Sequence, residues 1–139
     1  MTGNAGHDTI NGNDGDDLII GGTGNDNLRG GAGDDRFEIS NGDQYDDFDG
    51  GEGTDTIVAT EDNVTIGINT HFNPADSIEE ISADGNSGVS IAGDGSNNNM
   101  DFSETILTDI DHIDGGSDHD NITGSAGDDV IIGGTGNDN

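Results

Sequence analysis

The fold is decided by three consecutive nine-residue stretches, GNDGDDLII (12–20), GGTGNDNLR (21–29) and GGAGDDRFE (30–38). Each stretch begins with glycine, carries aspartate at its sixth position and carries an apolar residue at its eighth position. The same phase extends back to GNAGHDTIN (3–11). A fixed period of nine residues predicts a repeat architecture, in which each unit buries its apolar residue by stacking on its neighbours.

Five further units keep this phase after a two-residue insertion at 39–40. They are NGDQYDDFD (41–49), GGEGTDTIV (50–58), GGSDHDNIT (115–123), GSAGDDVII (124–132) and the truncated GGTGNDN (133–139). The aspartates at position six are Asp8, Asp17, Asp26, Asp35, Asp46, Asp55, Asp120, Asp129 and Asp138. The apolar residues at position eight are Ile10, Ile19, Leu28, Phe37, Phe48, Ile57, Ile122 and Ile131. Position four departs from glycine at Gln44 and Asp118, which puts the turns around these two residues in doubt.

The chemistry of each position explains the spacing. Glycines at positions one, two and four allow positive φ angles, so the first six residues can reverse the chain while carbonyl oxygens face a common centre. Aspartate at position six adds a carboxylate oxygen, and calcium accepts six to eight such hard oxygens in flexible geometry. Positions seven to nine predict a short strand, in which the side chain at position eight faces inward.

The nine units resemble the hemolysin-type calcium-binding (RTX) repeat family, whose pattern is G-G-x-G-x-D-x-U-x. The resemblance covers the two blocks of units and leaves the middle of the chain outside. It implies an all-β fold, a right-handed parallel β-roll or β-solenoid in which two units form one coil. It also implies that several Ca²⁺ ions lie in the turns, each between one turn and the next turn on the same edge.

The resemblance further implies a ligand set. The position-six aspartates named above would bind metal, together with the position-one glycines Gly3, Gly12, Gly21, Gly30, Gly115, Gly124 and Gly133. The aspartate pairs that would bridge successive turns are Asp8 with Asp26, Asp17 with Asp35, and Asp120 with Asp138. The pairs Asp26 with Asp46 and Asp35 with Asp55 depend on how the insertion at 39–40 is accommodated.

The composition makes folding conditional on bound cations. The chain of 139 residues has 31 acidic residues, two basic ones and a formal net charge of −29, with only 27% hydrophobic residues. A chain with this charge and so few apolar residues stays disordered unless its charge is neutralised. Binding of calcium and folding are therefore expected to be one linked event.

The same composition excludes several classes of function. A chain of this charge repels phosphate backbones and anionic membrane surfaces, so nucleic-acid binding is not expected. Its longest apolar runs have three residues, far from the roughly 20 that a spanning helix needs, so membrane insertion is not expected either. It has no cysteine, and its four histidines are scattered, so no catalytic constellation supports an enzyme.

The chain divides into a first repeat block (3–58), an irregular strand-rich middle (59–114) and a second, truncated block (115–139). Two placements of the middle remain open, as further solenoid rungs with longer turns or as a separate insertion. Because the repeat phase runs to both ends of the sequence, neighbouring repeats of a longer parent chain are expected.

Two functions follow as expectations. The first is a non-enzymatic calcium-binding module of a secreted protein exported by type I secretion, which folds outside the cell and serves a structural role. The alternative is an adhesin-type recognition module that binds polysaccharide, a cell surface or ice, with the 59–114 segment as the binding region. An exposed aromatic platform would favour the alternative, and Phe72 and Phe102 are the two phenylalanines of that segment.

Overall fold

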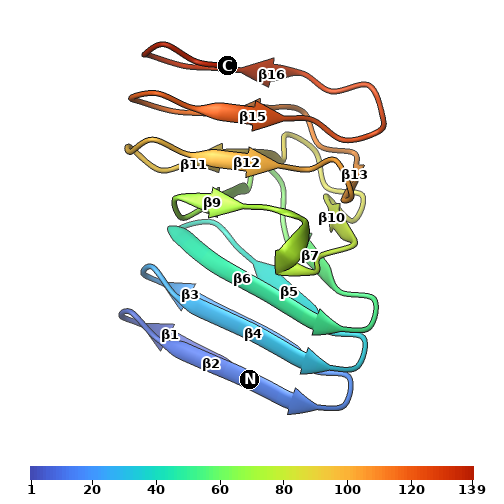
Figure 1. Ribbon diagram of the computed structural model, residues 1–139. Helices are drawn as coiled ribbons and strands as arrows, with labels where there is room; N and C mark the ends of the chain where they lie inside the picture. Colours follow the sequence, from blue (N-terminus) through green and yellow to red (C-terminus); the bar gives the residue numbers. More distant parts are fainter.

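The computed structural model describes residues 1–139 as a stack of parallel β-strand rungs (Figure 1). The strands are β1 (Thr2–Ala5), β2 (Thr9–Asp14), β3 (Leu18–Thr23), β4 (Asn27–Ala32), β5 (Arg36–Ile39), β6 (Tyr45–Glu52), β7 (Thr56–Ala59), β8 (Thr65–Ile68), β9 (His71–Phe72), β10 (Glu80–Ser82), β11 (Ser90–Gly93), β12 (Asn99–Asp101), β13 (Ile106–Thr108), β14 (Ile113–Asp114), β15 (Asn121–Thr123) and β16 (Ile131–Ile132). The 3-10 helix η1 (Pro74–Asp76) is the single helical segment. None of the helical structure could span a lipid bilayer.

Three parallel sheets form the walls of the stack. One sheet has the order β1-β3-β5-β7-β10-β13, the second β16-β14-β11-β8-β6-β4-β2, and the third β15-β12-β9. In the first block, consecutive strands alternate between the first two sheets, as two nonapeptides per coil require. The predicted all-β parallel solenoid of the β-roll type, with about seven turns, is confirmed.

The apolar residues of position eight stack on one another to form the core. In the first sheet, Ile19 pairs in register with Phe37, Phe37 with Ile57, and Ile57 with Ile81. All four of these side chains are buried. Side chains alternate across a strand, so repeating one apolar residue every nine positions builds a continuous column inside the stack.

The rungs change length along the stack. Thr2 pairs with Ile20, 18 residues further on, whereas Phe72 pairs with Met100, 28 residues further on. The spacing returns to 18 between β14 and β16. The strands between residues 59 and 114 pair with those before and after them, and the additional residues lie in the connections, including the one that contains η1.

Candidate metal centre

Position-six aspartates form hydrogen-bonded ladders along the edges of the stack. The backbone N–H of Asp17 donates to Oδ1 of Asp35 (2.8 Å), and the backbone N–H of Asp35 donates to Oδ1 of Asp55 (2.8 Å). The same contact joins Asp8 to Asp26, Asp26 to Asp46, and Asp120 to Asp138. The structure thus brings together all five aspartate pairs that the repeat pattern places on successive turns.

The second carboxylate oxygen of most of these aspartates is buried and has no hydrogen-bond partner. The atoms in this condition are Oδ2 of Asp8, Asp17, Asp26, Asp35, Asp55 and Asp120, and Oδ1 of Asn98. No other buried side-chain nitrogen or oxygen of the chain lacks a partner. A buried unpaired carboxylate is strongly unfavourable unless a cation compensates it. These oxygens therefore fit metal ligands.

Backbone carbonyl oxygens converge on the same places. A Cβ atom built on Gly3 would lie 2.6 Å from Oδ2 of Asp8 and 2.6 Å from the carbonyl oxygen of Gly21 on the next coil. A Cβ atom built on Gly115 would lie 2.7 Å from Oδ2 of Asp120 and 2.5 Å from the carbonyl oxygen of Gly133. Only glycine leaves this space open to a carboxylate from one turn and a carbonyl from the next.

The donor set is the one that calcium prefers. No group of three or more His, Asp or Glu side chains is arranged to hold a metal, so carboxylates alone do not form a site. Carboxylate oxygens supplemented by backbone carbonyls suit calcium, which takes many oxygen ligands and tolerates irregular geometry. Bound calcium would neutralise the buried carboxylates and join neighbouring turns.

Burial also changes the acidity of the ladder. It raises the pKa of Asp46 to about 7, with the nearby carboxylate of Asp26 adding to the rise. Burial raises the pKa of Asp55 to about 6, and it raises the pKa of Asp35 as well. Each rise means that the folded chain holds protons more tightly than the unfolded chain.

With rising pH, we expect the stability of the calcium-free fold to fall and the affinity for calcium to rise. In calcium-free buffer, the stabilisation from protonated Asp46 and Asp55 is complete below pH 4 and is lost as the pH rises through about 6 to 7. With calcium, protons compete for the same oxygens, so calcium affinity should rise over that range. Circular dichroism and calcium titrations at pH 4 to 8 measure both trends, and a calcium affinity independent of pH would contradict the prediction.

Asp129 and Asp138 lie in less complete surroundings than most of the other position-six aspartates. Both carboxylate oxygens of Asp129 accept hydrogen bonds from the hydroxyl of Ser125 (3.0 and 3.1 Å). Asp138 is exposed in the last turn, although its Oδ2 lies beside Gly133. The predicted glycines Gly12, Gly21, Gly30 and Gly124 each lie beside the position-six carboxylate of their own unit.

The structure shows one further nine-residue unit that the sequence pattern did not predict. Residues 93–101, GDGSNNNMD, have Asn98 at position six and Met100 at position eight. The backbone N–H of Asn98 donates to Oδ1 of Asp120 (2.8 Å), which extends the Asp120–Asp138 ladder by one rung. A Cβ atom on Gly93 would lie 2.5 Å from Oδ1 of Asn98. The available signal was the spacing of Met100 from Gly93, but the unit does not match the repeat pattern because position six is asparagine and not aspartate.

Asn98→Asp is expected to convert this amide position into a stronger calcium ligand. A carboxylate should tighten calcium binding there about tenfold, because added ligand charge raises calcium affinity. Without calcium the substitution should destabilise the fold. In the wild type the Asn98 amide donates to the Asp94 carboxylate (3.1 Å), whereas an aspartate at position 98 would repel that carboxylate. Thermal melts with and without calcium measure this reversal of sign. Asn97→Asp adds the same charge at an exposed neighbour, so equal behaviour of the two variants would contradict the prediction.

Comparison with known proteins gives one match. The family model described as the RTX calcium-binding nonapeptide repeat matches four copies, over residues 2–37, 49–66 and 107–139, which is more than half of the chain. Searches of curated proteins and of solved structures gave no match. The matched segments contain most of the position-six ladders and the glycine turns described above. The chain therefore belongs to the RTX calcium-binding nonapeptide repeat family.

Proposed function

We propose that this chain is a calcium-dependent structural module of a protein exported by type I secretion. It remains unfolded at the low calcium concentration of the cytosol and folds on binding calcium outside the cell. It carries out no catalysis. Its partners are calcium ions and the neighbouring repeats of a longer parent chain.

The observation that carries this proposal is the set of buried, unpartnered position-six oxygens. The chain has two basic side chains to balance 31 acidic ones. Arg36 forms ion pairs with Glu38 (3.2 Å) and Asp84 (3.1 Å), neither of which is a position-six carboxylate. The folded state therefore depends on cations from solution, and millimolar extracellular calcium can supply them.

Isothermal titration calorimetry on Asp35→Ala and Asp34→Ala tests calcium binding at the ladders. Each of these adjacent aspartates accepts one backbone N–H from a neighbouring rung, from Asp17 and Thr54 respectively (both 2.8 Å). Only Asp35 also has a buried oxygen without a partner. Asp35→Ala should lose one or two bound calcium ions relative to Asp34→Ala. The same number of ions in both variants would reject the proposal.

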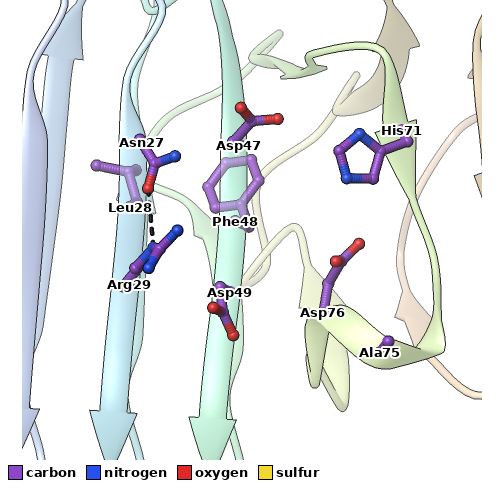
Figure 2. A pocket seen from close by; sticks show the side chains of 9 residues that line it. All are labelled: Asn27, Leu28, Arg29, Asp47, Phe48, Asp49, His71, Ala75 and Asp76. Carbon is purple, nitrogen blue, oxygen red and sulfur yellow. Dashed lines mark hydrogen bonds between the residues drawn. The ribbon is translucent and has the colours of Figure 1, made fainter.

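A second candidate function is recognition of a polar ligand, such as a polysaccharide, at a cavity of about 260 Å³. Figure 2 shows its wall, with Arg29 on β4 and Asp49 on β6 at one side and His71 and Asp76 at the other. Most of the side chains that line the cavity can form hydrogen bonds, which suits the hydroxyl groups of a saccharide. Phe72 and Phe102 provide no aromatic platform, because both are buried and stacked on each other at 4.9 Å. Glycan-array binding that is lost in Asp76→Ala would support this function, and binding unaffected by the change would argue against the cavity.

A further inference from the structure

One aspartate ladder continues past the last nonapeptide of the first block. It runs through Asp17, Asp35 and Asp55, and the backbone N–H of Asp55 then donates to Oε2 of Glu79 (2.7 Å). Strand pairing places Thr56 opposite Glu80, so Asp55 and Glu79 hold equivalent positions on successive rungs. Glu79 therefore occupies position six of a rung that has no nonapeptide sequence.

A backbone carbonyl completes the equivalence. A Cβ atom built on Gly12 or Gly30 would contact the position-one carbonyl oxygen of the next coil, that of Gly30 or Gly50. A Cβ atom built on Gly50 would contact the carbonyl oxygen of Ser77 in the same way. Ser77 has a left-handed conformation, with φ of 51°. It thus supplies the carbonyl that glycine supplies elsewhere on this edge.

One oxygen of the Asp55 carboxylate beside this carbonyl has no partner. Asp55 is 0% exposed, and its Oδ2 has no hydrogen-bond partner. A Cβ atom built on Gly50 would meet both Oδ2 of Asp55 and the Ser77 carbonyl oxygen. In the nonapeptide turns, Oδ2 of Asp17 has the same relation to Gly12 and the carbonyl of Gly30.

We propose that a further calcium site lies between the 50–55 turn and residues 77–79, with Oδ2 of Asp55, the carbonyl oxygen of Ser77 and the carboxylate of Glu79 among its ligands. Residues 77–79 lie outside the segments that match the nonapeptide family model. The segment uses three residues, from Ser77 to Glu79, where a nonapeptide turn uses six. The inference rests on the proposed calcium function and extends it to a turn that lacks the repeat motif.

This site would give the irregular middle of the chain its own dependence on calcium. Hard oxygen donors from two adjacent rungs are the ligands that calcium selects, and two carboxylates would supply most of the charge. The ion would hold the 74–79 connection against the first block. Calcium would therefore fix the connection at which the regular repeats give way to longer rungs.

Native mass spectrometry of calcium-loaded wild type, Glu79→Gln and Glu52→Gln tests the site. Glutamine keeps an oxygen that can accept the Asp55 N–H, so the rung should be retained while the charge is lost. Glu52 is exposed in the same 50–55 turn and its side chain makes no hydrogen bond, so Glu52→Gln is the matched control. At a calcium concentration that fills the wild type, Glu79→Gln should hold one ion fewer and Glu52→Gln the same number. An unchanged count in Glu79→Gln would overturn the inference.

A second measurement uses the wild-type chain and does not depend on how a variant folds. Crystals of the calcium complex soaked with terbium should show an anomalous peak between Asp55 and Ser77. Peaks in the nonapeptide turns without one at this place would overturn the inference and leave the proposed function standing. A wild type that binds no ion in either experiment would reject the proposed function itself.

Discussion

Excess EGTA at neutral pH is expected to abolish the β-sheet circular dichroism signal of the calcium-loaded chain. Ordering the backbone costs roughly 1–2 kcal/mol per residue, whereas one buried Ile or Leu per nonapeptide returns roughly 1.5–3 kcal/mol. Ladder hydrogen bonds contribute only about 1 kcal/mol each. Without calcium, the buried carboxylates of Asp26 and Asp46 would also lie unneutralised on successive turns of one edge, as would those of Asp35 and Asp55 on the other.

Return of calcium should restore the signal, and excess magnesium should not. Magnesium demands nearly ideal octahedral geometry and gives up its water reluctantly, so fixed carbonyl and carboxylate oxygens suit it poorly. The ionic strength should be matched with sodium chloride, which separates specific binding from charge screening. A β-sheet spectrum that persists in EGTA would show that the fold does not depend on metal.

Gly51→Ala is expected to prevent normal stacking of the third coil on the second. Gly51 has φ of +105°, and an added Cβ would lie 2.9 Å from the carbonyl carbon and 3.1 Å from the Cα of Gly31. Backbone strain at such a φ costs roughly 1–3 kcal/mol, and forcing an extra methyl into packed structure costs a further 1–3 kcal/mol or so. A calcium-saturated denaturant titration should show a loss of roughly 2–6 kcal/mol in the free energy of unfolding.

Gly42→Ala is the matched control for this prediction. Gly42 has nearly the same φ, +101°, but nothing lies within 4 Å of the Cβ that alanine would add. The control should therefore lose only the roughly 1–3 kcal/mol of backbone strain. Equal losses in the two variants would mean that coil-to-coil contact at Gly51 contributes nothing.

The nonapeptide blocks were predictable because their two decisive positions are chemically uniform. Aspartate at position six and an apolar residue at position eight set both the turn and the inward side chain, so the column through Ile19, Phe37 and Ile57 follows directly from the period. Insertion at 39–40 lengthens the rung by two residues and leaves the Asp35–Asp55 contact intact.

The middle rungs could not be aligned in this way. Their ladder positions are held by Asn98 and Glu79, and their connections differ in length, so no fixed spacing links them in the sequence. Strand pairing to the neighbouring coil, which is a tertiary property, sets their register. The Ser77 carbonyl could not be foreseen at all, because a backbone oxygen has no signature in the sequence.

The unequal rungs have a consequence for how the chain avoids misalignment. Coils of 18 residues with the same aspartates and apolar residues could slip past one another by a whole coil and still satisfy most contacts within the first block. Such a shift would set the 28-residue interval between Phe72 and Met100 against partners that do not match it. The unequal coil lengths of the middle thereby disfavour pairing shifted by a whole coil, so that the otherwise interchangeable coils of the first block have one favoured register.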